Sequence, residues 1–203
     1  MFSPTPGRLK SRLGGSRAGL TLIELLTVIA VISILISILI PTVSTVRTSA
    51  RRAKAKIILI QWATAIETFR QEYGFYPAFS FETEGLIAST SDTDEFVQAL
   101  SSRDTENLPG SAAGNEKQIT FYTFSEGEIS EGDLLVDPFG GTPIAVLVDR
   151  NYDGIIKVGS GEDYETLPNI GSSTPSSSWP ANGLRAGVAI YSPGAGGKAI
   201  TTW

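Results

Sequence analysis

The feature that most constrains this chain is an apolar run near its N-terminus, Leu20 to Ile40, which reads LTLIELLTVIAVISILISILI. Its 21 residues contain a single charge, on Glu24. A helix of this length rises about 30 Å, the thickness of the hydrocarbon core of a membrane. The sequence therefore predicts a membrane-spanning helix over 20–40. Residues 1–19, rich in Ser, Gly, Pro and Arg, are predicted to be a leader without regular structure.

Charge is distributed unevenly along the 203 residues. The leader contains Arg8, Lys10, Arg12 and Arg17 and no acid, whereas the rest of the chain has 12 basic and 21 acidic residues. Because basic flanks of a span tend to stay in the cytoplasm, the C-terminal part is predicted to lie on the other side of the membrane. The acidic remainder argues against nucleic acid as a partner, since phosphate contacts need basic side chains.

Two residue types that support most catalytic and metal chemistry are absent. The chain has no cysteine, which excludes disulfides, thiolate nucleophiles and zinc–thiolate sites. It also has no histidine, which removes the commonest general base and transition-metal ligand. We therefore expect the chain not to be an enzyme.

The helical pattern continues beyond the span but changes in character. Pro41 lacks an N–H donor and is expected to kink the helix. The sequence predicts an amphipathic helix over 41–77, ended by Gly74 and Pro77. Its apolar stripe is expected to comprise Val43, Val46, Ala50, Ala53, Ile57, Ile60, Ile66, Phe69 and Tyr73.

The remaining residues, 78–203, are predicted to form a globular α/β-loop and β-sheet region. A short helix is expected over Asp94–Leu100, capped by Asp92 or Thr93. Strands are expected at 119–124, 144–149, 155–158 and 186–192, which read ITFYTF, IAVLVD, IIKV and AGVAIYS. The predicted fold is α+β: a long kinked N-terminal helix, half transmembrane and half amphipathic, packed on a small antiparallel sheet.

One loop between predicted strands has the spacing of a cation-binding turn. Asp149, Asn151 and Asp153 alternate before Gly154, and alternate oxygens on a tight loop can converge on calcium. The twelfth position of an EF-hand loop should hold Glu but is Ser160 here. The other interpretation is a polar hairpin turn, in which these residue types are favoured for backbone reasons alone.

A run of basic residues follows the span: Arg51, Arg52, Lys54 and Lys56. Most such runs are solvated helix faces. A functional interpretation is pairing with acidic residues of a neighbouring subunit, and the candidates are Glu82, Glu84 and Asp92.

Three ordinary interpretations compete for residues 8–40. A cleaved secretory signal should have a shorter apolar core that ends in small residues. A simple signal anchor explains the length and the flanking charge but not Glu24, because a carboxylate in a membrane span is costly. A buried core helix would not need 21 apolar-rich residues in a row.

The residues around the start of the span carry a family resemblance. The stretch Arg17 to Leu26, RAGLTLIELL, resembles the prepilin cleavage motif of type IV pilins and type II secretion pseudopilins. The resemblance implies that a prepilin peptidase cuts between Gly19 and Leu20 and that Leu20 is then N-methylated. Glu24 becomes the fifth residue of the mature chain and Pro41 the twenty-second, as in the family. Glu24 is expected to pair with the terminal amine of a neighbouring subunit during assembly.

Three later stretches resemble the major pseudopilin of type II secretion. They are Tyr73–Pro77 (YGFYP), Asp137–Ile144 (DPFGGTPI) and Ser192–Gly197 (SPGAGG), the last with Gly196 where the family has Asp. In the family, calcium is held by loop oxygens near the C-terminal sheet.

The resemblance implies a structural function. The chain is expected to enter the inner membrane as a single-pass protein, to be processed by prepilin peptidase, and to join a periplasmic pseudopilus. Its expected partners are other copies of itself, minor pseudopilins, the inner-membrane assembly platform and membrane lipid. The alternatives are a type IV pilus subunit, a minor pseudopilin and, in a different class, a membrane-anchored ligand-binding ectodomain.

Overall fold

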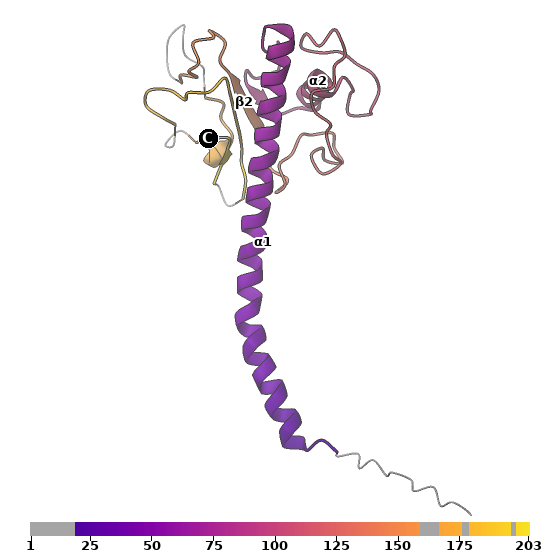
Figure 1. Cartoon of the computed structure of the whole chain (residues 1–203), viewed down its shortest axis with the longest axis vertical. Coiled ribbons are helices and arrows are strands. Elements are labelled where there is room, and N and C mark those ends of the chain that lie inside the picture. The colour runs from indigo at the N-terminus through magenta and orange to yellow at the C-terminus, as the bar shows by residue number, and fades with distance from the viewer. Residues whose placement is uncertain (1–18, 159–166, 176–178, 196–197) are drawn as a thin grey trace, which may run out of the picture. The chain divides into compact units, whose positions relative to one another are not determined.

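The computed structural model describes residues 19–158, 167–175, 179–195 and 198–203 (Figure 1). The chain divides into two compact units, Met1–Thr45 and Val46–Trp203. The fold is α+β, as the sequence predicts, with one long N-terminal helix and a four-stranded antiparallel sheet. The leader lies outside the described residues except for Gly19.

Helix α1 spans Leu22–Tyr73 and comprises 52 residues. Helical backbone continues through Pro41. The helix ends where Gly74 adopts a φ of 82°, and the Gly74 N–H donates to the Arg70 carbonyl at 2.8 Å. Glycine is favoured at this position because a left-handed residue closes the last helical turn without a side-chain clash.

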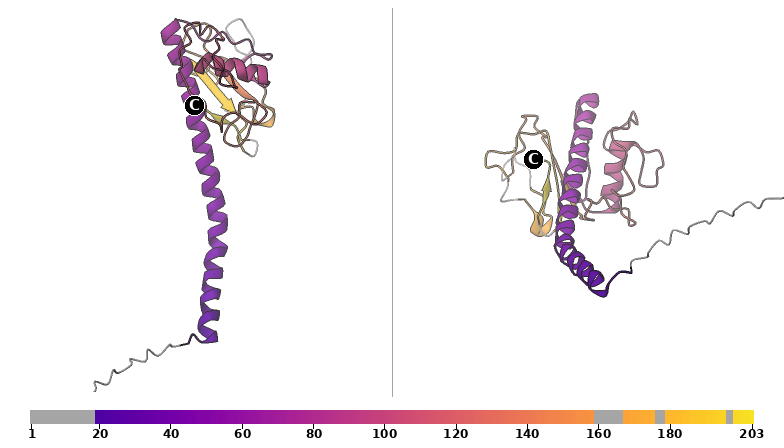
Figure 2. Two further views of the ribbon diagram at one scale, coloured as in Figure 1. Left: turned by 90° about the vertical axis from the view of Figure 1, so that its right-hand side faces the viewer. Right: turned by 60° about the horizontal axis from the view of Figure 1, so that its bottom comes forward.

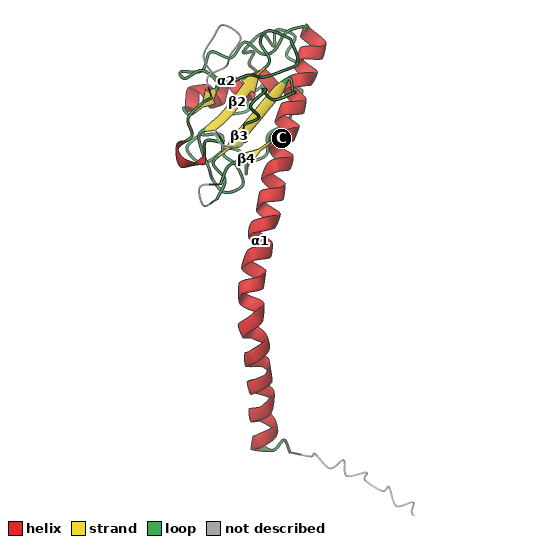
Figure 3. Cartoon of the chain, turned by 90° about the vertical axis from the view of Figure 1, so that its left-hand side faces the viewer, coloured by secondary structure: helices red, strands yellow, loops and turns green. Residues whose placement is uncertain are grey.

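The sheet has the order β1-β2-β3-β4 and belongs to the second unit (Figure 3). Its strands are β1 (Leu86–Ile87), β2 (Ile144–Val148), β3 (Val188–Ser192) and β4 (Ile200–Thr201). The two long central strands pair with Val146 opposite Ile190. These strands confirm the predictions at 144–149 and 186–192.

Both faces of the sheet are buried, which explains why its central strands are continuous apolar runs. One face packs against α1 through Ile144, Val146 and Ile190. The other packs under the C-terminal loops through Ala145, Leu147 and Tyr191. Successive strand residues point to opposite faces, so a strand covered on both sides needs apolar residues throughout.

Two predicted strands are wrong. Residues 119–124 form no strand, because the N–H groups of Phe121 and Tyr122 both donate to the Leu100 carbonyl at the end of α2. Phe121 and Tyr122 pack against the core, as their apolar character predicts. Residues 155–158 form no strand: Ile156 makes an isolated bridge with Leu184, and Val158 also lies in an isolated bridge. Strand β2 pairs with β1 and β3 instead, so Asp149–Gly154 does not connect two paired strands.

Helix α2 spans Thr90–Ser101 and begins earlier than predicted, with Ser89 as its N-cap. The Asp92 carboxylate accepts hydrogen bonds from the N–H groups of Glu82, Ala88 and Ser89. Burial alone would raise the pKa of Asp92, but these donors lower it overall. Asp92 is therefore a buried capping residue and is not available to pair with a neighbouring subunit.

Within the second unit, α1 has two apolar faces. In the left view of Figure 2 the sheet, α2 and the loops lie on one side of this part of α1 and leave its other side uncovered. The single predicted stripe was wrong, because Ile60 and Ile66 are six residues apart and lie on different faces. The inner face comprises Ala55, Ile58, Leu59, Trp62, Ala65, Ile66 and Phe69. The outer face comprises Val46, Ala50, Ala53, Ile57 and Ile60.

Candidate functional site

The first turn of α1 is closed by a capping box. The Glu24 N–H donates to the Thr21 hydroxyl at 3.3 Å, and Glu24 Oε2 accepts from the Thr21 N–H at 2.8 Å. The Thr21 hydroxyl also donates to Glu24 Oε2 at 2.8 Å. Each side chain thus satisfies a backbone donor that the helix end leaves open. The Thr-x-x-Glu spacing signals this box in the sequence, and sequence reasoning missed it.

The predicted cut site lies directly before this helix. Gly19 and Leu20 are exposed and precede the helical residues. A Cβ added to Gly19 would meet nothing within 4 Å. The described part of the chain therefore supplies no packing reason for glycine at this position.

The first unit presents an apolar helix surface. The part of α1 up to Ile40 is long and apolar enough to cross a membrane. Its large aliphatic side chains, such as Leu25, Ile29 and Leu39, are exposed in the isolated chain. The side chain of Pro41 lies outside the described residues. An uncovered apolar helix of this length is suited to a membrane or to packing among other helices.

The outer face of α1 in the second unit is also apolar. Val46, Ile57 and Ile60 are 61%, 56% and 41% exposed. Ala50 and Ala53 lie between them and are also exposed. Small residues between larger aliphatic ones let a second helix approach closely. This surface can bind another helix and offers no group for catalysis.

Asp137 joins two of the loops that carry the family resemblance. It is 1% exposed, and its Oδ1 accepts from the N–H groups of Phe139 and Gly141 at 2.8 and 2.9 Å. Its Oδ2 accepts from the Ser192 hydroxyl at 2.8 Å and the Gly194 N–H at 3.0 Å. One carboxylate therefore holds the DPFG loop against the SPG loop. Sequence reasoning identified both motifs but not their contact.

The predicted calcium loop is organised by its own backbone. Asp149 Oδ2 accepts from the Gly154 N–H at 2.8 Å, and Asn151 Oδ1 accepts from the Asp153 N–H at 3.3 Å. Asp153 accepts from the Ile155 N–H and forms an ion pair with Lys157 at 2.9 Å. The Lys157 ammonium holds the pKa of Asp153 below its ordinary value. Ser160 lies outside the described residues.

The described part of this loop offers one carboxylate oxygen without a partner and one carboxylate that is already paired. Asp149 is 3% exposed, and its Oδ1 is buried without a hydrogen-bond partner. Calcium takes about six to eight oxygen ligands, and the other carboxylate, of Asp153, is already paired with an ammonium group. No group of three or more acidic side chains that could hold a metal occurs in the part of the chain that the structure describes.

We expect millimolar calcium to leave the melting temperature of the full chain unchanged. Asp149 Oδ2 and Asp153 Oδ1 already accept N–H groups and Asp153 Oδ2 is paired with Lys157, so calcium would have to compete with that ammonium group. Thermal melting in detergent with calcium or with a chelator measures this, and magnesium serves as the control cation. A rise in melting temperature that calcium alone produces, and that Asp149→Asn removes, would establish the loop as a calcium site.

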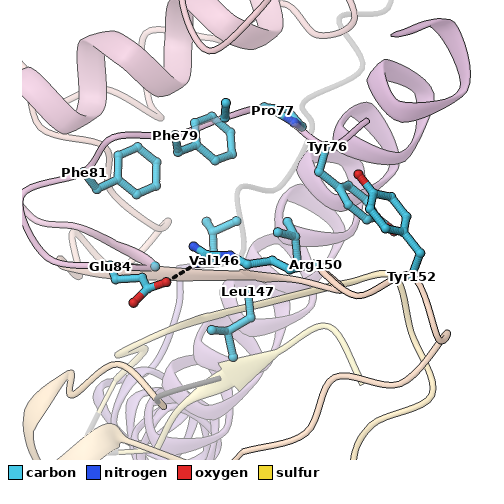
Figure 4. Close-up of a pocket in the computed structure, with 12 residues that line it drawn as sticks. Tyr76, Pro77, Phe79, Phe81, Glu84, Val146, Leu147, Arg150 and Tyr152 are labelled. Atoms are coloured by element: carbon cyan, nitrogen blue, oxygen red, sulfur yellow. Dashed lines mark hydrogen bonds and ion pairs between the residues drawn. The ribbon is translucent and has the colours of Figure 1, made fainter. Parts of the chain in front are cut away.

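An aromatic groove lies beside the sheet in the second unit (Figure 4). Its volume is about 480 Å³, with Phe79 and Phe81 on one side and strand β2 on the other. An ion pair between Arg150 and Glu84 crosses it. Tyr76 lies at one end, where burial, together with the charge of Glu67, raises its pKa to about 12, so the phenol stays neutral.

Comparison of the chain with protein-family models, with curated proteins and with solved structures finds no match in any of the three.

Proposed function

We propose that this chain is a membrane-anchored filament subunit of the type IV pilin and pseudopilin kind. The observation that carries the proposal is the uncovered apolar outer face of α1 in the second unit. A helix that only anchored a soluble domain would need apolar residues within the membrane, and its exposed face beyond the membrane would be polar. Here Val46, Ile57 and Ile60 are exposed on that face.

The outer face combines exposed aliphatic residues with small ones, as helix-packing surfaces do. Full burial of a Val or Ile side chain stabilises by about 1.5–3 kcal/mol, and these three are roughly half exposed, so a helix contact would gain about 3 kcal/mol. The neighbouring alanines permit the close approach that such a contact needs. Many copies packed in this way would form a filament whose core consists of α1 helices.

The cut site supports the same function. Glycine at position 19 has no role in the described packing, so we attribute it to recognition by a prepilin peptidase. Cleavage before Leu20 would remove the basic leader and release the helix end. Leu20 would then carry the methylated amine, next to the capping box of Thr21 and Glu24.

Within the family, we propose the major pseudopilin of type II secretion. The contact between the DPFG and SPG loops through Asp137 supports this, because the two motifs that resemble the major pseudopilin form one structural unit. The subunit would be stored in the inner membrane and added by the assembly platform, with minor pseudopilins, to a periplasmic filament. A type IV pilus subunit or a minor pseudopilin would use the same anchor and outer face.

Glu24 has two candidate roles, and one pair of variants separates them. Glutamine can replace glutamate in a capping box, whereas alanine cannot. We expect Glu24→Gln to be cut like the wild type but to assemble poorly, because it keeps the cap and loses the charge that would pair with a neighbour's amine. Processing is followed by mass and assembly by filament yield. Thr21→Val serves as control, since it removes the capping hydroxyl and keeps the carboxylate. Wild-type assembly by Glu24→Gln would contradict the pairing.

The aromatic groove favours one function of another class, a membrane-anchored ligand-binding ectodomain. Its lining includes Phe79, Phe81 and Tyr152, which could bind an apolar ligand. Such a receptor needs neither a cut at Gly19 nor an apolar outer helix face. Retention of the leader in the mature protein would therefore favour the receptor.

A further inference from the structure

A dense group of basic residues lies on α1 shortly after the apolar run. Between Glu24 and Glu67 the chain has no acidic residue, and all the basic residues of this stretch fall within 47–56. They are Arg47, Arg51, Arg52, Lys54 and Lys56. The structure divides them into two sets with different surroundings.

Two of the five hold the C-terminal strand region in place. Arg52 donates to the Ala199 carbonyl at 2.6 Å, and Lys56 donates to a main-chain oxygen of Trp203 at 3.2 Å. Both are thus engaged within the second unit. Their positive charge has a partner in the folded chain.

The other three have no such role. Arg47, Arg51 and Lys54 are exposed, and their i, i+4, i+7 spacing places them on one face of the helix. Among the residues that the structure describes, they make no hydrogen bond or ion pair. Like charges at this spacing destabilise a helix, so these three residues do not stabilise the isolated chain. Together they form an unpaired cationic stripe.

Sequence position places this stripe near a membrane surface if the apolar run spans a bilayer. Arg47 comes seven residues after Ile40, which corresponds to about 10 Å of helical rise. Helix side chains lean toward the N-terminus, which here is toward the span, and long basic side chains extend to reach polar headgroups. Basic residues are also disfavoured on the translocated side, and three of the five there have no partner within the described part of the chain.

We propose that Arg47, Arg51 and Lys54 bind the phosphate headgroups of anionic phospholipids at the surface where α1 leaves the membrane. This inference rests on the membrane anchor of the proposed function. The stripe holds the subunit at the bilayer surface, and the lipid contacts are given up when the subunit joins a filament. Each cation next to an anionic surface contributes about a fivefold preference for that surface.

The test uses the full chain in phosphatidylcholine bilayers with spin-labelled lipids. The measured quantity is the association constant of phosphatidylglycerol relative to phosphatidylcholine. We expect a preference of about fivefold or more for the wild type, and its loss in the triple variant Arg47→Gln, Arg51→Gln, Lys54→Gln. High salt should weaken the wild-type preference, because it screens exposed charges. The matched control, Lys117→Gln, Arg150→Gln, Arg185→Gln, removes the same charge from exposed positions elsewhere and should keep the preference.

Four results of these experiments would contradict the proposed lipid binding, and they point to three different explanations. If the wild type is embedded in the bilayer but shows no preference for phosphatidylglycerol, the stripe does not bind lipid. The same conclusion follows if the control variant loses as much of this preference as the triple variant does. Carbodiimide cross-links between copies that require Lys54, without a lipid preference, would assign the stripe to the acidic surface of a second copy. A chain that alkaline carbonate extracts from the bilayer would instead refute the membrane anchor itself.

Discussion

Replacement of Ile57 by aspartate is expected to abolish filament assembly while the globular unit stays folded. Ile57 is 56% exposed on the outer face of α1, so its loss should change the free energy of unfolding by only about 1 kcal/mol. In a filament the same position would be buried against another helix. A carboxylate at this position would be buried without an ion-pair or hydrogen-bond partner, which costs several kcal/mol. The association constant for filament assembly would therefore fall about 100-fold or more.

The measurement is filament yield by electron microscopy and sedimentation, together with the melting temperature of the unassembled subunit. Ile57→Leu keeps the volume and apolar character and should assemble normally. Leu59→Asp is the contrasting variant, because Leu59 is fully buried on the inner face and its replacement should unfold the subunit. Normal assembly of a folded Ile57→Asp subunit would refute the outer face as the packing surface.

Replacement of Asp137 by alanine is expected to lower the free energy of unfolding of the second unit by roughly 4 kcal/mol, because several buried donors lose a charged acceptor at once. Those donors are the N–H groups of Phe139, Gly141 and Gly194 and the hydroxyl of Ser192. For a domain of this size the melting temperature should fall by about 10 °C or more. The two loops should also lose their contact.

Thermal melting of the full chain in detergent, followed by near-ultraviolet circular dichroism, measures this loss. Asp137→Asn should have an intermediate effect, because the amide keeps one acceptor oxygen. Asp104→Ala is the matched control, since its carboxylate accepts from the Leu108 N–H on an exposed loop. If Asp137→Ala and Asp104→Ala lower the melting temperature equally, Asp137 is not the residue that joins the two loops.

The sequence predicts the parts of this fold that produce long or continuous apolar patterns. The runs at Ile144–Val148 and Val188–Ser192 are strands because both of their faces are buried. Strands β1 and β4 have two residues each, which is too short for an alternation of apolar and polar residues to be seen. The pattern at 119–124 correctly indicates burial, but burial does not specify pairing, and its N–H groups donate to Leu100.

Among the candidate sites, the sequence predicts local motifs but not contacts between distant segments. Local motifs such as Gly19–Leu20 and Thr21–Glu24 can be read from spacing alone. A helical period shows that residues share a face but not whether that face points inward, and Ile57 and Ile60 lie on the outward face. The role of Asp137 depends on a contact with Ser192, 55 residues further along the chain, and one sequence carries no signal for it.

The mass of the N-terminal peptide, from protein extracted from the membranes of its native host, tests the central claim most directly. A filament subunit of this kind should begin at Leu20, with the mass of one methyl group added to the α-amine. The leader, including Arg8 to Arg17, should be absent. A mature protein that begins at Met1, or one cut beyond Ile40 so that the span is lost, would contradict the claim.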